Sequence, residues 1–131
     1  MTGFTHINLA DVDDAAIPNG FADRWEAHVA RTALDAKEIG VSHFRIHPGR
    51  RSPFAHRHSE AEEIYVILGG SGRMRLGTET RDVGRLDAIR VAPDVVRAFE
   101  AGPDGLEILV FGRHHAADGE LVKDGWVDGS G

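Results

Sequence analysis

The segment HRHSEAEEIYVIL, residues 56–68, joins two histidines to the longest apolar run of the chain. Branched and aromatic residues dominate residues 62–68, which predicts a β-strand. In an extended chain, residues two apart lie on one face, so His56 and His58 present their imidazoles on the same side. The polar link at residues 59–61 reverses the chain. If the two strands pair, either Glu62 or Glu63 faces the histidines.

Two imidazoles and one carboxylate on one side of an ion match the facial arrangement that holds non-haem iron and other divalent metals. Glu63 shares a strand face with Tyr65 and Ile67, whereas Glu62 shares the opposite face with Ile64. Both faces contain apolar residues, so alternation alone does not decide which glutamate points inward. The residues by themselves predict a metal site with His56, His58 and one of the two glutamates.

Outside this segment, short apolar stretches alternate with turn signals. Spacings of eight to twelve residues between such signals are typical of a sandwich or barrel. We expect a short strand through Phe4, Ile7 and Leu9, a closing turn at residues 69–72 and a tight turn at residues 101–105. The other expected strands are residues 25–31, 41–47, 54–58, 73–76, 79–83, 86–91, 95–100 and 106–111, with a hairpin at Gly77-Thr78.

Composition limits the classes of partner and site that the chain can have. A chain of 131 residues suits one domain with a real core. Its 15 basic and 21 acidic side chains give a net charge of −6 with no basic patch, which argues against nucleic-acid and anionic-membrane partners. The absence of cysteine excludes disulfides and thiolate metal sites. The longest apolar run is too short to span a membrane, and no secretory signal is visible, so we expect a cytoplasmic protein.

The chain resembles the cupins over residues 41–111. The first cupin motif reads Gly, about five residues, His-x-His, three or four residues, Glu, six residues, Gly. Here Gly49, His56, His58, Glu63 and Gly70 follow that order, with one extra residue after the first glycine. The series through Glu62 and Gly69 also satisfies the spacing. The resemblance implies that Glu63 is the ligand, because the family's glutamate usually comes directly before the aliphatic stretch.

The resemblance implies an all-β fold, a jelly-roll (cupin-like) β-barrel with a short N-terminal arm. We expect one domain, in which residues 1–40 form the arm and first strands, residues 41–111 the barrel core, and residues 112–131 a polar C-terminal extension. We treat His114 and His115 as surface residues, since adjacent residues of an extended chain point opposite ways. The resemblance also implies a homodimer.

The second cupin motif departs from the family pattern. Arg97 stands where the resemblance expects a fourth ligand histidine. A guanidinium has only donors and keeps its proton, so Arg97 cannot bind a metal. In one reading, a metal still binds and Arg97 grips a substrate carboxylate or phosphate. In the other, Arg97 pairs with Glu63 and replaces the ion.

Two main functions follow. The first is an enzyme of oxygenase, isomerase or lyase type that uses Fe, Mn, Ni or Zn and no organic cofactor. Its substrate would be a small anionic or carbonyl-containing molecule, and the substrate-binding residues would be Arg97, Tyr65, Phe99 and Met74. The alternative is a metal-free module that binds a small molecule without catalysis. A weaker third reading is a metal-free isomerase with His56 or His58 as general base.

Overall fold

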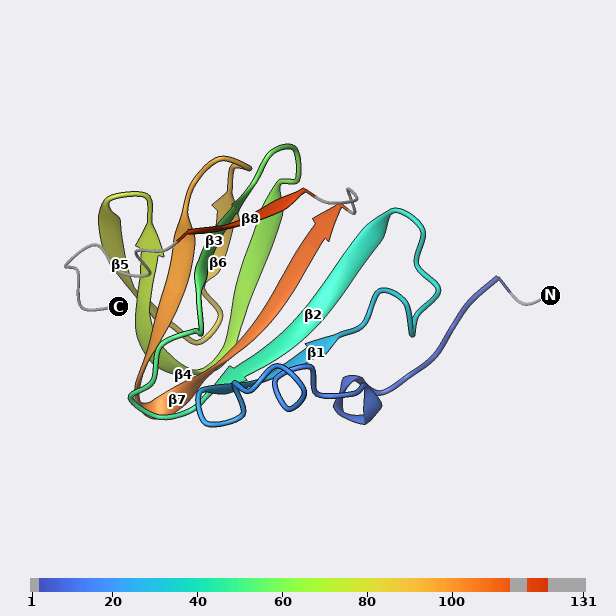
Figure 1. Cartoon of the computed structure of the whole chain (residues 1–131), viewed down its shortest axis with the longest axis horizontal. Coiled ribbons are helices and arrows are strands. Elements are labelled where there is room, and N and C mark those ends of the chain that lie inside the picture. Colours follow the sequence, from blue (N-terminus) through green and yellow to red (C-terminus); the bar gives the residue numbers. More distant parts are fainter. Residues whose placement is uncertain (1–2, 114–117, 123–131) are drawn as a thin grey trace.

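The computed structural model describes residues 3–113 and 118–122, and it is built almost entirely from β-strands. The predicted all-β jelly roll is confirmed: one eight-stranded sheet curls into an open barrel (Figure 1). A short 3-10 helix, η1, precedes it at Leu9–Asp11. The strands are β1 Trp25–Val29, β2 Ile39–Ile46, β3 Ala55–His58, β4 Glu63–Leu76, β5 Glu79–Gly84, β6 Ala88–Val91, β7 Arg97–Arg113 and β8 Gly119–Val122. No described helix is long and apolar enough to cross a membrane.

Two long strands organise the sheet. β4 and β7 run side by side through the middle of the barrel (Figure 1). β7 also pairs with β2 and, at one end, with β3, while β4 pairs with β5 and β6 on its other edge. β1 extends the sheet beyond β2, and β8 runs antiparallel to β3. All of these pairings are antiparallel.

The core lies on the inner face of the curled sheet. Alternation along β4 turns Tyr65 and Ile67 inward, where both are buried, and leaves Ile64 on the outer face. Directly paired residues of neighbouring strands share a face, so the inner residues of several strands meet. The buried cluster comprises Ile46, Tyr65, Ile67, Met74, Val83, Val91, Phe99, Ala101, Leu106, Ile108 and Val110.

Two predicted turns are wrong. β4 continues through residues 69–72, and β7 continues through residues 101–105. The glycines bend the paired strands instead of ending them, because the register between β4 and β7 shifts on both sides of Gly70. Gly70 has a φ of 74°, which glycine adopts without strain. The hairpin predicted at Gly77-Thr78 is confirmed, since Leu76 pairs with Glu79.

The two ends of the chain differ from expectation. No strand forms through Phe4 and Ile7; η1 follows instead, with the Asn8 side chain accepting a hydrogen bond from the Ala10 amide at 2.9 Å. β1 ends at Val29, two residues before the predicted end at Arg31. Part of the expected C-terminal extension forms β8. His114 and His115 lie outside the described residues.

Candidate metal centre

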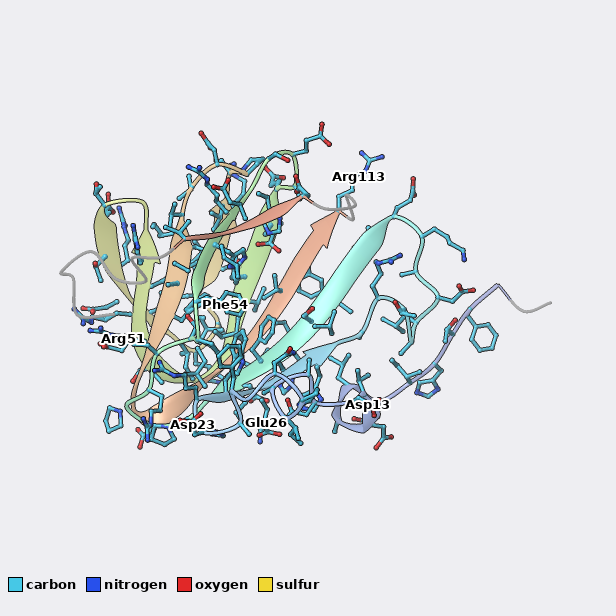
Figure 2. The ribbon with its side chains drawn as sticks, in the orientation of Figure 1. Asp13, Asp23, Glu26, Arg51, Phe54 and Arg113 are labelled. Atoms are coloured by element: carbon cyan, nitrogen blue, oxygen red, sulfur yellow. The ribbon has the colours of Figure 1, made fainter. Side chains whose placement is uncertain are left out.

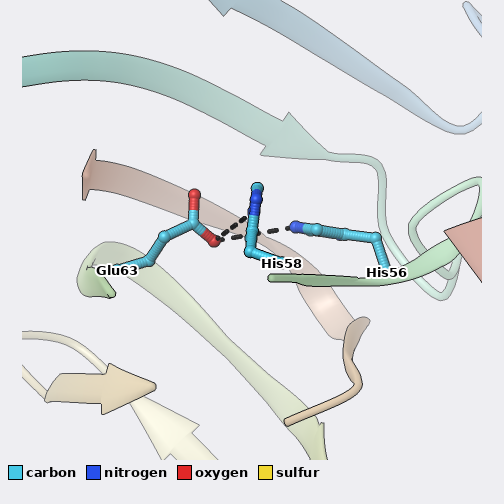
Figure 3. A group of neighbouring side chains, drawn as sticks. All are labelled: His56, His58 and Glu63. Carbon is cyan, nitrogen blue, oxygen red and sulfur yellow. Dashed lines mark ion pairs between the residues drawn. The ribbon is translucent and has the colours of Figure 1, made fainter. Parts of the chain in front are cut away.

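Three side chains meet at the junction of β3 and β4. His56 and His58 come from β3, and Glu63 is the first residue of β4. One ligand atom from each lies within 4.8 Å of the other two. The carboxylate oxygen Oε1 of Glu63 is 3.3 Å from Nε2 of His58 and 3.6 Å from Nε2 of His56 (Figure 3). The geometry therefore brings two imidazole nitrogens and one carboxylate oxygen to one point.

The register of β4 decides which glutamate takes part. Glu63 pairs with Val91 of β6 and Gly112 of β7 and shares the inner face with Tyr65. Glu62 precedes the strand, and its side chain is 57% exposed and pairs with Arg90 at 3.2 Å. Glu62 is therefore a surface ion-pair residue, and Glu63 is the carboxylate that meets the histidines.

The Glu63 carboxylate is held in its charged form. Burial of this carboxyl favours the neutral form, but contacts from His56 and His58 and a hydrogen bond from the Tyr65 hydroxyl outweigh burial. Together they hold the pKa of Glu63 well below its usual range. The Tyr65 hydroxyl donates to Oε1 at 2.7 Å. Burial in turn raises the pKa of Tyr65, so the phenol stays protonated and keeps the carboxylate in position.

A fourth residue, Asp118, lies behind His58. Its Oδ2 is 3.2 Å from Nδ1 of His58, and its side chain is buried. The same carboxylate accepts hydrogen bonds from the backbone amides of Ser59, Glu60 and Ala61 and from the Ser59 hydroxyl. The Ser59 hydroxyl and these amides lower the pKa of Asp118. Asp118 therefore ties the link between β3 and β4 to the imidazole that faces Glu63.

The donor set fits a divalent metal. Both ring nitrogens of His58 are buried and have no well-directed hydrogen-bond partner, although carboxylate oxygens lie close to both. A buried polar atom without a partner costs free energy, and a metal bound at Nε2 would remove that cost. Two imidazoles with a carboxylate suit Fe, Mn, Ni and Zn. A carboxylate behind a ligand histidine is a common arrangement around such ions.

Arg97 lies on the same inner face but does not contact Glu63. It pairs directly with His56 across β3 and β7, and it is 0% exposed. Its guanidinium donates to the backbone carbonyls of Ala92 at 3.0 Å and Pro93 at 3.4 Å, while Nε has no partner. Within residues 3–113 and 118–122, the ion pairs of Glu63 are those with His56 and His58. The Arg97–Glu63 pair of the metal-free alternative is therefore not formed.

A cavity of about 270 Å³ adjoins the centre. His58, Glu63 and Asp118 lie on one side of it, and its other lining residues are Val29, Arg31, Gly40, Val41, Ser42, Ala61, Val110, Gly112, Arg113 and Gly119. None of the residues expected to bind substrate lines this cavity. Tyr65, Met74 and Phe99 are buried in the core, and the Tyr65 and Phe99 rings pack at 5.3 Å. Their role in binding stays a prediction.

The sequence analysis singled out neither Asp118 nor Arg31, and the structure places both at this cavity. Asp118 lies in a stretch that looks like a polar tail, and only the pairing of β8 with β3 brings it to His58. Arg31 follows β1 and looks like any exposed arginine. No local pattern marks either residue.

Comparison with known proteins identifies the family. The family model of the cupin domain matches residues 42–111, which is more than half of the chain. The chain belongs to the cupins. A search of curated proteins found no match for this cupin.

Solved structures share the fold at low sequence identity. A cupin protein from Bacteroides fragilis is 24% identical, with a TM-score of 0.71 over 89% of each chain. The polyketide cyclase RemF from Streptomyces resistomycificus is 19% identical, with a TM-score of 0.74 over 95% of this cupin and 90% of that chain. An oxalate decarboxylase from B. subtilis is 17% identical, with a TM-score of 0.74 over 90% of this cupin and 32% of that chain.

Proposed function

We propose that this cupin is a divalent-metal-dependent enzyme that acts on a small anionic or carbonyl-containing molecule. One observation carries the proposal: ligand atoms of His56, His58 and Glu63 lie within 4.8 Å of one another beside a cavity. Structural neighbours include a polyketide cyclase, an oxalate decarboxylase and a nucleoside dehydratase, which supports an enzymatic role. Oxygenase, isomerase and lyase chemistry all fit this fold, and a cytoplasmic location is part of the proposal.

Each residue of the site has a distinct role. His56, His58 and Glu63 hold the ion, which supplies Lewis-acid or oxygen-activating chemistry when bound. Asp118 orients the His58 ring, so that Nε2 carries the free electron pair. The Tyr65 hydroxyl fixes the Glu63 carboxylate.

The surroundings of the site favour chemistry on a small substrate. Val29 and Val110 give part of the cavity an apolar lining next to the reacting groups. A substrate that displaces water from this lining strengthens the electrostatic interactions between itself and the site. The Glu63 carboxylate and the His58 ring both border the cavity, so a bound molecule would lie next to the proposed ion.

The metal-free alternative has less support. It depended on a guanidinium that takes the place of the ion beside Glu63. In the structure, the Arg97 guanidinium instead donates to the Ala92 and Pro93 carbonyls. The Glu63 carboxylate is left facing the two imidazoles, which is the arrangement that an ion needs.

Metal content tests the proposal directly. We expect the protein, purified without an affinity tag and loaded with Mn²⁺ or Zn²⁺, to retain close to one ion per chain after dialysis. The His56→Ala/His58→Ala double variant is expected to retain almost none, because only one of the three ligands remains. His6→Ala, at an exposed histidine, is the matched control and is expected to keep the ion. Loaded wild-type protein that retains no metal would overturn the proposal.

A further inference from the structure

We propose that Arg31 binds the carboxylate of a small carboxylic-acid substrate in the cavity beside the metal centre. The inference rests on the proposed function and names its substrate class. Arg31 lines the same cavity as His58 and Glu63. It takes the anion-binding role that the sequence had suggested for Arg97, whose guanidinium is buried against backbone carbonyls.

Two glycines separate Arg31 from Glu63. A Cβ built on Gly40 would lie 3.8 Å from both Cβ and Cδ of Arg31, so the arginine stem runs along Gly40. Gly40 pairs with Gly112 across β2 and β7, and Gly112 pairs with Glu63 across β7 and β4. The inner sheet surface from Gly40 of β2 to Glu63 of β4 forms the floor of the cavity. It is therefore two strand spacings wide, roughly 10 Å, and no side chain stands on it between these two residues.

That open floor has room for a small molecule. A Cβ on Gly112 would lie 3.2 Å from Cγ of Glu63, so a larger residue there would press on the ligand carboxylate. The cavity of about 270 Å³ is slightly smaller than most small-molecule sites, which typically measure about 300–1,000 Å³. A molecule of a few carbon atoms could reach both the ion and Arg31.

Arg31 has donors available for an anion. One terminal nitrogen, Nη1, donates to the Ala36 carbonyl at 3.1 Å. No acidic side chain within residues 3–113 and 118–122 forms an ion pair with Arg31. A guanidinium carries five N–H donors in a planar fork that matches a carboxylate. Arg31 therefore keeps most of its donors for a ligand after it has anchored the β1–β2 loop.

The charges of the site favour an anionic ligand. The carboxylates of Glu63 and Asp118 balance the two charges of a divalent ion. The positive charge of Arg31 then remains for the substrate. The apolar lining at Val29 and Val110 strengthens this attraction, because it lowers the local dielectric.

Binding of malonate, measured by calorimetry on the Mn²⁺-loaded protein at fixed ionic strength, tests the inference. We expect malonate to bind and its neutral counterpart malonamide not to bind. Arg31→Gln is expected to weaken malonate binding on the order of tenfold, the value of one charge-assisted hydrogen bond, without loss of metal. A merely structural tie to Ala36 would instead lower the thermal stability and leave the affinity for malonate unchanged.

Arg85→Gln is the matched control. Arg85 is exposed in the β5–β6 turn and does not line the cavity, unlike Arg113 at the end of β7 (Figure 2). Removing the charge of Arg85 changes only the long-range field and is expected to alter affinity about twofold or less. An equal loss in both arginine variants would overturn the inference, as would unchanged affinity in Arg31→Gln or no malonate binding by the loaded wild-type protein.

A second experiment, in a variant that lacks one metal ligand, tests this inference independently of the proposed function. Glu63→Gln removes a ligand and its charge, so malonate binding can be measured without metal. If adding Arg31→Gln to the Glu63→Gln protein weakens malonate binding by a similar factor, the role of Arg31 is supported even if the wild-type protein holds no ion. Equal affinity for malonate in Glu63→Gln and in Glu63→Gln/Arg31→Gln would overturn the role of Arg31.

Discussion

Asp118 is the residue that we propose orients the ring of His58. Its carboxylate approaches Nδ1 of the ring while it accepts three backbone hydrogen bonds from the β3–β4 link. An acceptor beside Nδ1 favours the tautomer with its proton there, which leaves Nε2 free to bind an ion. The side chain thus connects the fold of the link to the chemistry of the site.

We expect Asp118→Asn to weaken Zn²⁺ binding by about 10–100-fold, the usual effect of losing such a partner. The same variant should shift His58 away from the Nδ1–H tautomer, as seen in two-bond ¹⁵N–¹H spectra of the metal-free protein. A purely structural role would not change the tautomer.

Glu120→Gln is the control for this residue. Glu120 lies two residues away and pairs with Arg57 at the surface. It is expected to leave both the affinity and the spectrum unchanged. Wild-type affinity and an unchanged tautomer in Asp118→Asn would contradict the assigned role.

At the scale of elements, the path of β4 depends on its close approach to β7. A Cβ on Gly72 would lie 2.2 Å from the backbone oxygen of Glu100, and one on Gly70 would lie 2.0 Å from that of Gly105. Neither oxygen can move without breaking the pairing of the two longest strands. The glycines thus allow a bent but continuous pair, which curves the sheet around the core.

We expect Gly72→Ala to lower the free energy of unfolding by about 1–3 kcal/mol, the usual cost of forcing an extra carbon into a packed region. Urea denaturation measures this change. Gly84→Ala serves for comparison, because a Cβ there meets nothing within 4 Å and the backbone has no positive φ. It should change stability by less than about 0.5 kcal/mol. Equal stability of the two variants would show that β4 and β7 can separate at this point.

At the scale of the whole molecule, the outer face of the sheet carries apolar side chains. Ile64 is 42% exposed and Phe111 is 37% exposed, and they pair directly across β4 and β7. Phe111 also pairs with Val41 of β2 on the same face. Contiguous exposed apolar surface of this kind is typical of an interface. It is consistent with the homodimer that the cupin resemblance implies.

Light scattering coupled to size-exclusion chromatography tests that association. The wild-type protein is expected to elute with the mass of two chains, and Ile64→Glu with the mass of one, because burying an unpaired carboxylate at an interface is costly. Leu86→Glu, at a residue 67% exposed in the β5–β6 turn, should stay dimeric. A single-chain mass for the wild-type protein at micromolar concentration would refute the dimer.

Local patterns in the sequence predicted most strands, the two histidines on one face and a glutamate, Glu62 or Glu63, that faces them. The two-residue period of a strand places His56 and His58 on one face, and the link to Glu63 is short. These relations depend only on residues close together in the chain. The middle parts of β4 and β7 were wrongly predicted to be turns, because a glycine that ends a strand and a glycine that bends one look the same in the local sequence.

The sequence by itself therefore determined the all-β class, the cupin motif and its candidate ligands, since each depends on patterns among residues close together in the chain. Only the tertiary structure decided the inward turn of Glu63, the position of Asp118 behind His58 and the open floor before Arg31. The physical reason is that each of these three features depends on which strand pairs with the strand that carries the residue. Pairing of β3 with β8 and of β2 with β7 joins residues that are tens of positions apart.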